Sequence, residues 1–562
     1  MIAIGYAPFC QSAEMRPMTP SRDASLSAPV TAPWWRGAVI YQIYPRSFAD
    51  ADGDGVGDLA GITARLDHVA KLGVDGIWIS PFFTSPMRDF GYDVADYCDV
   101  DPIFGTLADF DALVARAHEL GLKVTIDQVY AHTSDLHPWF AQSRQGRDGD
   151  KADWYVWRDP KPDGTPPNNW QSVFGGPAWT WDARRRQYYM HTFLREQPQL
   201  NVHNPVVQDA LLEAAKFWLD RGVDGFRLDA LNHSMFDPQL RDNPPAEDDG
   251  RIRTRPFDFQ EKVFSQSHPD VALFVERIRK LCDRYDAIFT VAEVGGARAE
   301  VEMKEYTAGA HRLNSAYGFD FLYAESLTPA LIRDTLAKWT GAPGEGWPSW
   351  AFENHDAPRA VSRWCAPEER AAFAPLKKML LLALRGNVIL YQGEELGLVQ
   401  DDIPFELLQD PEAIANWPLT LSRDGVRTPM PWRADAPNGG FTTGTPWLPM
   451  SAENLSRAVD VQEAEPGSLL HWTRSLLALR RATPVLRLGS FEVIHADADL
   501  LAFVRRHEGR AVAGLFNLSA RPVVLPEGLA IAGQVLASVN GASLEEAGDL
   551  PGYGGLLVAL QE

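Results

Sequence analysis

Three acidic residues stand at the ends of strongly apolar runs, where β-strands should stop. They are Asp229 in GVDGFRLDAL, Glu293 in IFTVAEVGG and Asp356 in WAFENHDAPR. In a barrel of parallel strands the carboxyl ends meet at one mouth, so acids far apart in the chain can converge on one substrate. Converging acids indicate acid/base or nucleophilic chemistry. Alternatively, these acids could cap helices or pair with arginines. Such a structural role is the commoner one for a single acid, but not for an ordered set of acids.

A second group of carboxylates lies in one short loop, DADGDGVGD. Its candidate metal ligands are the side chains of Asp50, Asp52, Asp54 and Asp58 and the carbonyl of Val56. Four carboxylates so close repel one another unless a hard cation neutralises them, and their alternation with glycine is similar to the start of a Ca²⁺ loop. The twelfth position is Gly61 instead of a glutamate, which argues against a helix-loop-helix hand. We expect a structural Ca²⁺ or Mg²⁺ site here, with a solvated turn as the alternative.

The composition narrows the possible partners. The 562 residues carry 53 Lys and Arg against 75 Asp and Glu, a net charge of −22, which disfavours nucleic acid and anionic membranes and favours a neutral ligand such as a sugar. The cysteines, Cys10, Cys98, Cys282 and Cys365, are far apart and are predicted to be free thiols. No apolar stretch approaches the roughly 20 residues of a membrane span. We expect a cytoplasmic protein, either a monomer or a homodimer, with no organic cofactor.

Short apolar runs alternate with amphipathic helices along most of the chain, and this rhythm predicts how the acids are held. Candidate strands lie at 38–48, 75–81, 123–129, 224–231, 287–294, 312–322, 347–356 and 387–395, and candidate helices at 59–73, 107–121, 206–222, 271–285, 327–339 and 368–384. Eight such units predict an α/β fold, a (β/α)₈ TIM barrel. The alternative is an open doubly wound sheet, which normally carries a Gly-rich phosphate loop after its first strand; none follows here.

Other segments depart from this rhythm and divide the chain into regions. Residues 1–33, rich in Ser, Pro, Thr and Ala, are predicted to be a disordered leader. The barrel is expected over 34–130 and 204–482, with an irregular insertion at about 398–450. Residues 131–203, rich in Trp, Pro, Gly and Asn, should form an inserted subdomain after the third strand, beside the barrel mouth. Short alternating runs over 483–562 predict a C-terminal antiparallel β domain.

The segments DQVYAH, GFRLDAL, VAEV and ENHD, in this order and on successive strands, resemble the signature regions of glycoside hydrolase family 13, in the α-amylase superfamily. QIYPRSF, RTPMPW and YQGEELG extend the resemblance to the α-glucosidase and oligo-1,6-glucosidase branch. It implies a retaining mechanism, which requires two carboxyl groups about 5–5.5 Å apart. By resemblance Asp229 is the nucleophile, Glu293 the acid/base and Asp356 a third carboxylate that binds sugar hydroxyls.

The neighbours of these acids predict their protonation. Arg227 precedes Asp229 by two residues, so both side chains point to the same face of the strand, where the cation should keep Asp229 ionised. Asp127, on the third strand, is expected to orient Arg227. The apolar residues around Glu293 should favour its neutral, proton-donating form.

The resemblance also implies a set of substrate-binding residues: Asp89, Tyr92, His132, Phe174, Phe193, Arg227, His355, Arg359 and Arg423. The histidines would donate hydrogen bonds to the sugar, Asp89 and Arg423 would pin the terminal glucose and close the pocket, and Tyr92 would offer a stacking face. The two phenylalanines would form apolar walls, and Arg359 would lie near the sugar. Alternatively, the histidines could be structural, Asp89 and Arg423 could form an ordinary loop ion pair, and the phenylalanines could belong to the core.

These observations predict a retaining, exo-acting α-glucosidase for maltose-like sugars or sucrose, able to transfer glucose to other acceptors. Ala230 follows the nucleophile where members that prefer α-1,6 bonds tend to have Val, which favours α-1,4 bonds or sucrose. A disaccharide isomerase or a glucosyltransferase of the same family is the first alternative. The second is a non-catalytic relative that serves as a transporter-associated subunit; such a chain should show a membrane span and a broken set of acids, and this sequence shows neither.

Overall fold

The computed structural model describes residues 32–248, 250, 252–342, 344–419, 422–529, 531–544 and 549–561. The predicted leader, apart from its last two residues, and Cys10 lie outside these ranges. Within them Cys98, Cys282 and Cys365 are free thiols, as predicted. No helix in the described ranges is long and apolar enough to cross a bilayer.

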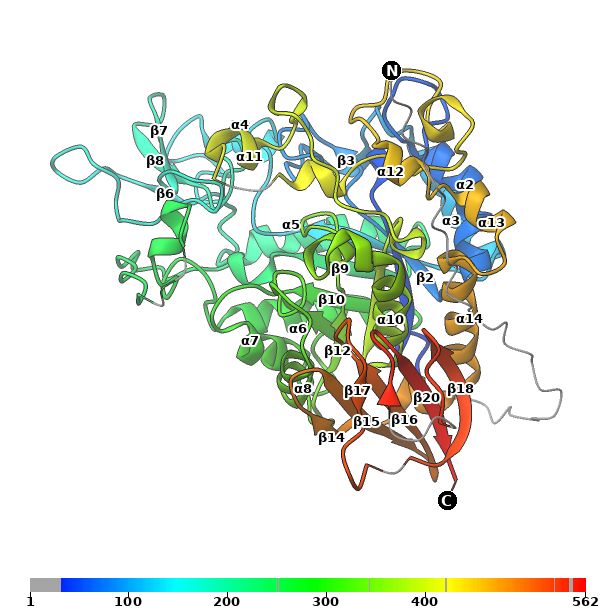
Figure 1. Ribbon diagram of the computed structural model, residues 1–562. Coiled ribbons are helices and arrows are strands. Elements are labelled where there is room, and N and C mark those ends of the chain that lie inside the picture. Colours follow the sequence, from blue (N-terminus) through cyan, green and yellow to red (C-terminus); the bar gives the residue numbers. More distant parts are fainter. Residues whose placement is uncertain are drawn as a thin grey trace, which may run out of the picture.

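Eight parallel strands close into a barrel at the centre of the molecule, in the order β1-β13-β12-β11-β10-β9-β5-β2 (Figure 1). They are β1 Val39–Ile43, β2 Gly76–Ile79, β5 Lys123–Val129, β9 Gly225–Asp229, β10 Phe289–Glu293, β11 Ser315–Tyr317, β12 Trp347–Trp350 and β13 Asn387–Tyr391. Every predicted strand is present, and the closed barrel is confirmed over the open sheet. Strand closure places the carboxyl ends of all eight strands around one mouth.

A layer of helices surrounds the strands, because each crossover between parallel strands carries an amphipathic helix. The larger ones are α2 Leu59–Leu72, α3 Leu107–Glu119, α5 Pro205–Leu219, α6 Val271–Cys282, α7 Ala299–Thr307, α8 Pro329–Ala337, α10 Arg370–Ala383 and α14 Leu469–Ala482. Asp58 caps the start of α2, where its carboxylate accepts the Gly61 N–H. Gly73 caps the end of α2 in the left-handed region, with φ 90°. The helices α7 and α14 were not predicted.

Three groups of smaller elements decorate the barrel (Figure 1). Residues 131–203 form α4 Pro138–Ser143 and an antiparallel sheet of β6 Trp157–Arg158, β8 Gln187–Met190 and β7 Trp179–Asp182, and nearby β3 Phe83–Thr84 pairs with β4 Asp96–Val100. Short helices are α1 Pro45–Phe48, α9 Ala360–Arg363, α11 Pro411–Asn416, α12 Ala452–Leu455, α13 Val459–Ala464 and α15 Pro484–Leu488. The C-terminal sheet, orange to red, has the order β14-β15-β16-β20-β18 and is antiparallel, as predicted.

The strands of the C-terminal sheet are β14 Glu492–Ala496, β15 Leu500–His507, β16 Arg510–Asn517, β18 Gly533–Val539 and β20 Gly555–Leu560, with a separate pair of β17 Val523–Val524 and β19 Asp549–Leu550. On β15 the buried Arg505 donates a hydrogen bond of 2.6 Å to the carbonyl of Ala383, at the end of α10. This contact joins the sheet to the barrel.

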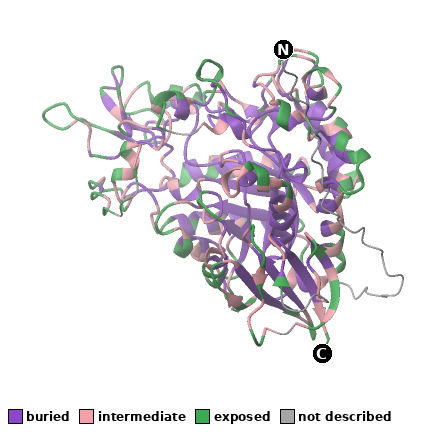
Figure 2. Ribbon diagram, in the orientation of Figure 1, coloured by how far each residue is buried: buried purple, intermediate pink, exposed green. Residues whose placement is uncertain are grey.

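The main core lies between the strands and the helix layer, and the barrel strands are buried apart from Lys123 at the start of β5 (Figure 2). Trp218 of α5, for example, packs its ring edge-to-face on Phe110 and Phe82, with centroids 4.8 and 5.3 Å away. Burying an aromatic side chain of this size contributes about 2–3 kcal/mol. Packing of this kind fixes the barrel, and the barrel fixes the side chains at its mouth.

Candidate active site

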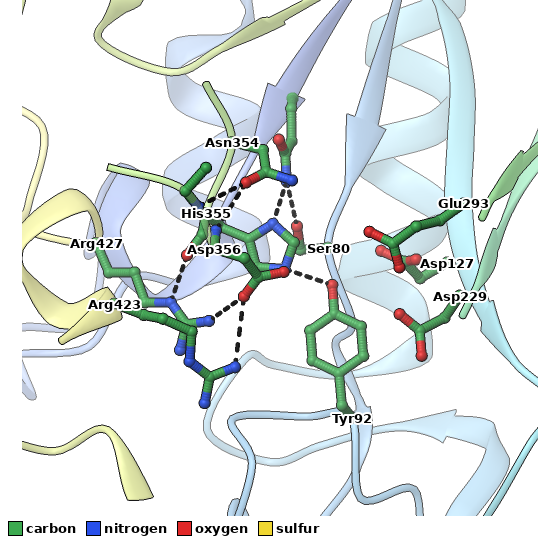
Figure 3. Close-up of polar contacts among 12 residues, drawn as sticks. Ser80, Tyr92, Asp127, Asp229, Glu293, Asn354, His355, Asp356, Arg423 and Arg427 are labelled. Atoms are coloured by element: carbon green, nitrogen blue, oxygen red, sulfur yellow. Dashed lines mark hydrogen bonds and ion pairs between the residues drawn. The ribbon is translucent and has the colours of Figure 1, made fainter. Parts of the chain in front are cut away.

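The two acids expected to do the chemistry end neighbouring strands. Asp229 is the last residue of β9 and Glu293 the last residue of β10, and the pairing of Ala292 with Leu228 sets them side by side. Arg227 binds both: its Nη1 lies 2.6 Å from Asp229 Oδ1 and its Nη2 lies 2.7 Å from Glu293 Oε2. Because one guanidinium bridges them, the two carboxylates converge (Figure 3).

A third carboxylate holds the same arginine. Asp127 on β5 has its Oδ1 2.6 Å from Arg227 Nη1, while its Oδ2 accepts the indole N–H of Trp78 at 2.8 Å. The geometry agrees with the expectation that Asp127 orients Arg227. One buried cation therefore faces three carboxylates on this side of the mouth.

Burial and this excess of negative charge raise the pKa values of two of these acids. Burial raises the pKa of Asp229 well above its ordinary value, and the nearby Glu293 raises it further, against the attraction of Arg227. Burial likewise raises the pKa of Asp127 to about 6, although Arg227 opposes the shift. The expectation that Arg227 keeps Asp229 ionised stays a prediction: the guanidinium acts in that direction, against burial and the charge of Glu293.

The surroundings of Glu293 differ from those its sequence neighbours predict. Its Oε2 accepts hydrogen bonds from Arg227 and, at 3.2 Å, from the N–H of Ala230, and its Oε1 lies 3.0 Å from the hydroxyl of Tyr317. The flanking Ala292 and Val294 pack instead into the outer core. Successive side chains of a strand face opposite sides, so apolar neighbours in sequence leave the glutamate itself in a polar environment.

Asp356, just after β12, has the opposite charge balance. Its Oδ1 lies 2.6 Å from Arg427 Nη2 and 3.4 Å from Arg423 Nη1, and its Oδ2 lies 3.2 Å from His355 Nε2. Burial acts to raise the pKa of Asp356, but the His355 ring and the two guanidinium groups outweigh it and hold that pKa well below its ordinary value. Sequence reasoning missed Arg427, although it lies in the RTPM segment.

His355 lies beside Asp356 and contacts Tyr92 (Figure 3). Its Nδ1 lies 2.8 Å from Gln42 Nε2, which can only donate, so the ring hydrogen is on Nε2, 2.7 Å from the Tyr92 hydroxyl. The rings of His355 and Tyr92 are stacked, with centroids 5.5 Å apart and planes at 9°. Burial lowers the pKa of His355 to about 3, so the ring is neutral and its one N–H faces the Tyr92 hydroxyl.

His132 is held in a similar way at the end of β5. Its Nε2 lies 3.0 Å from the carbonyl of Tyr92, and Phe193 packs edge-to-face on its ring, with centroids 5.2 Å apart. Burial lowers the pKa of His132 to about 4. Both predicted histidines are thus brought to the mouth in the neutral form.

The residues expected to pin the terminal glucose also meet. Arg423 Nη2 lies 3.1 Å from Asp89 Oδ1 and 2.7 Å from Asp410 Oδ1, and its guanidinium carbon lies 5.0 Å from the centroid of the Phe174 ring. Phe174 in turn contacts Phe193, with ring centroids 5.7 Å apart. Burial raises the pKa of Asp89 despite Arg423. Asp410 lies in the irregular insertion, where no sequence signal marked it.

Arg359 does not lie where the resemblance implied. It is fully buried, and its Nη1 binds Glu353 Oε1 at 3.2 Å and the carbonyl of Gln392 at 2.8 Å, while its Nη2 donates to the carbonyl of Val426 at 3.3 Å. Arg359 therefore lies behind the mouth and holds the chain next to Arg427. Its closeness to the ENHD segment in sequence does not set the direction of its side chain.

The acidic loop gathers part of the predicted metal site. Carboxylate oxygens of Asp50, Asp52 and Asp58 lie within 4.8 Å of one another, whereas Asp54 accepts the N–H of Val56 at 2.7 Å. Three convergent carboxylates are the donors that a hard divalent cation prefers, so this part of the loop fits Ca²⁺ or Mg²⁺. Asp58 also caps α2, so an ion here would be tied to the start of that helix.

The fold and the ordered acids define the class of protein. The family model of the alpha-amylase catalytic domain matches residues 42–489. The chain therefore belongs to the alpha-amylase family, glycoside hydrolase family 13.

Relatives place the chain within the α-glucosidase branch of that family. It is 54% identical over 493 residues to the "Probable alpha-glucosidase" of Rhizobium meliloti (strain 1021), covering 86% of this chain and 89% of that protein. It is 37% identical over 527 residues to the oligo-1,6-glucosidase of Heyndrickxia coagulans, covering 87% and 93%. The structure of the alpha-glucosyl transfer enzyme XgtA matches with a TM-score of 0.91 at 49% identity. The structure of the trehalulose synthase MutB from Pseudomonas mesoacidophila MX-45 matches with a TM-score of 0.86 at 33% identity. Each match covers 94% of this chain and 100% of the other chain.

Proposed function

We propose that the protein is a retaining, exo-acting α-glucosidase that releases terminal glucose from short oligosaccharides, either maltose-like or sucrose. The observation that carries this proposal is the bridge of Arg227 between Asp229 and Glu293, which holds two carboxyl groups together at one mouth. Glycoside hydrolysis with retention needs such a pair, one as nucleophile and one as acid/base.

The reaction follows from these roles. Glu293 gives its proton to the glycosidic oxygen as the bond from that oxygen to the anomeric carbon breaks, and a carboxylate oxygen of Asp229 bonds to the anomeric carbon. Water then attacks that carbon and passes a proton to Glu293, and the bond to Asp229 breaks. The first half of the reaction uses the proton that Glu293 carries, and the second half returns it.

The other side of the mouth would hold the sugar. Asp356, kept ionised by Arg423 and Arg427, can accept hydrogen bonds from glucose hydroxyls and stabilise the positive charge of the oxocarbenium-like transition state. The contact between Arg423 and Asp89, beside the Phe174 ring, would close the pocket behind the terminal glucose. A pocket closed on that side supports exo action.

Glucosyl transfer is the second candidate, and it is favoured by the likeness to the alpha-glucosyl transfer enzyme and the trehalulose synthase. Both reactions pass through the same glucosyl-enzyme and differ in whether water or a sugar accepts the glucose. The role of a non-catalytic transporter subunit is disfavoured, because the full set of acids is assembled and no described helix could span a membrane.

Three measurements test the proposal. Asp229→Ala and Glu293→Gln should each abolish hydrolysis of maltose. An α-glucosyl fluoride with a second fluorine on the sugar ring, which reacts slowly, should leave a glucosyl adduct on Asp229 that mass spectrometry detects. Product analysis with maltose, isomaltose, sucrose and trehalose then separates hydrolysis from transfer and tests the preference that Ala230 predicts. Near-normal hydrolysis by either variant would refute the function.

We further propose that Asp50, Asp52 and Asp58 bind Ca²⁺ or Mg²⁺ as a structural ion. An ion there would offset the repulsion among these carboxylates and fix the loop that begins α2. The cytoplasmic location and the oligomeric state remain predictions.

A further inference from the structure

Tyr317 is a buried tyrosine at the barrel mouth that the reaction scheme above does not use. It ends β11, the strand next to β10, and its backbone is paired in register with Glu293. Its hydroxyl oxygen lies 3.1 Å from Arg227 Nε, 3.0 Å from Arg227 Nη2 and 3.0 Å from Glu293 Oε1. The hydroxyl therefore stands between the shared cation and the acid/base.

The direction of these hydrogen bonds follows from counting donors. A guanidinium can only donate, so the two contacts with Arg227 occupy both lone pairs of the Tyr317 oxygen. The hydroxyl hydrogen then has one acceptor left within reach, Glu293 Oε1. Burial raises the pKa of Tyr317 well above its ordinary value, so the hydrogen stays on the tyrosine.

Glu293 consequently has donors at both oxygens. Tyr317 donates to Oε1, and Arg227 and the N–H of Ala230 donate to Oε2. When Glu293 releases its proton to the leaving group, negative charge develops on this carboxylate. Donors fixed in advance around a developing charge lower the barrier to forming it.

We propose that Tyr317 is a positioning residue that strengthens Glu293 as a proton donor by hydrogen bonding to the carboxylate formed as the glycosidic bond breaks. The inference rests on the proposed α-glucosidase function. The rate increase due to the hydroxyl should depend on the leaving group. A sugar leaving group must be protonated as it departs, whereas fluoride departs with little protonation.

Tyr317→Phe tests this assignment, because it keeps the ring and removes only the hydroxyl. We expect kcat/KM to fall about 10- to 100-fold on maltose, the loss of one hydrogen bond to a charged group, and less than about threefold on α-glucosyl fluoride. An equal loss on both substrates would overturn the inference.

Tyr41→Phe is the matched control. The Tyr41 hydroxyl also donates to a buried carboxylate, Glu395 Oε1 at 2.7 Å, but on β1 and toward the helix layer. This variant should lower the thermal midpoint without changing the ratio of kcat/KM for maltose to that for the fluoride. A change in that ratio as large as that in Tyr317→Phe would show that losing any buried hydroxyl causes the effect.

The pH profile gives a readout that a purely structural role would not move. The charged and titratable groups that face Glu293 are Arg227 and Asp229 on β9, Asp127 on β5, and Tyr317 and Tyr323 on and after β11. The alkaline limb of kcat/KM for maltose reports loss of the proton that the leaving group needs. Without the hydroxyl the carboxylate is less stabilised, so this limb should move to higher pH in Tyr317→Phe; an unmoved limb would contradict the proposal.

A second variant keeps the inference testable if the phenylalanine variant does not fold. Fluorotyrosine at position 317 retains the ring and hydroxyl but makes the hydroxyl a stronger donor, so the alkaline limb should move to lower pH; a shift to higher pH would count against the proposal. Failure of the proposed function is distinct, because it would appear as activity retained in Asp229→Ala whatever Tyr317 does.

Discussion

The two sides of the barrel mouth treat their acids in opposite ways. On the side of β5, β9 and β10 one guanidinium, Arg227, faces three carboxylates, and the pKa values of Asp229 and Asp127 are raised. On the side of β12 the carboxylate of Asp356 contacts two guanidinium groups, Arg427 and Arg423, and its pKa is depressed, although Arg423 also binds Asp89 and Asp410 (Figure 3). Burial acts on both sides, so the number of cations that each acid contacts makes the difference: Asp229 and Asp127 share one guanidinium, whereas Asp356 contacts two.

The largest expected effect comes from removing the proposed nucleophile on the side of β5, β9 and β10. Asp229→Ala should lower kcat/KM for maltose by about 10⁴-fold or more, because no covalent intermediate can form. Added azide should restore turnover of α-glucosyl fluoride and give the inverted glucosyl azide, since the vacated space admits a small nucleophile. A product of retained configuration would contradict the assignment.

Removing a cation from the other side should have the next largest effect. Arg427→Met leaves Asp356 with Arg423 and less compensation for burial, so the acid limb of the pH profile should move to higher pH and kcat should fall about 100-fold at pH 7. Arg433→Met is the control, because Arg433 is exposed and pairs with the exposed Asp435. Equal losses in the two variants would mean that charge balance at Asp356 is unimportant.

The same contrast predicts opposite dependences of stability on pH. The pKa of Asp127 is raised to about 6 against about 3.9 in the unfolded chain, so its contribution to the free energy of unfolding decreases by about 2–3 kcal/mol as pH rises from about 4 to 6. The depressed pKa of Asp356 means that it stabilises the fold above about pH 4 and loses this effect as pH falls.

Urea unfolding of the wild type, Asp127→Asn and Asp356→Asn from pH 3 to 7 measures both slopes. The difference between wild type and Asp127→Asn should fall with rising pH, and the difference between wild type and Asp356→Asn should grow. If the two differences change in the same direction, the two sides of the mouth do not differ as described.

The smallest effect is expected away from the mouth, at the acidic loop. Added Ca²⁺ or Mg²⁺ should raise the thermal midpoint by about 2–4 °C relative to EDTA, because an ion that binds only the folded chain stabilises it. Asp52→Asn should abolish the shift, whereas Asp54→Asn should retain it, since Asp52 belongs to the carboxylate cluster with Asp50 and Asp58 and Asp54 does not. A shift that survives Asp52→Asn would place the ion elsewhere.

The fold could be predicted from the sequence because the barrel strands are mostly apolar runs that alternate with amphipathic helices. Asp356, expected to end a strand, lies instead in the loop after β12, but β9 and β10 do end in acids. The acids at those ends, Asp229 and Glu293, and the arginine two residues before Asp229 were predicted for the same reason. Arg427, Asp410 and Tyr317 were not predicted, because their loops and strands carry no periodic pattern that aims a side chain at the mouth. Arg359 was misplaced, because its neighbours in sequence do not show that it turns toward Glu353.

The sequence by itself determined which strands exist and which acids end them, because strand periodicity and apolar runs are local properties of the chain. Only the tertiary structure decided how many cations surround each acid. Three carboxylates from β5, β9 and β10 share Arg227, whereas Asp356 gains Arg423 and Arg427 from a loop more than sixty residues away in the chain. Charges act through space and are strengthened by burial, so the protonation of this site is a property of the closed barrel.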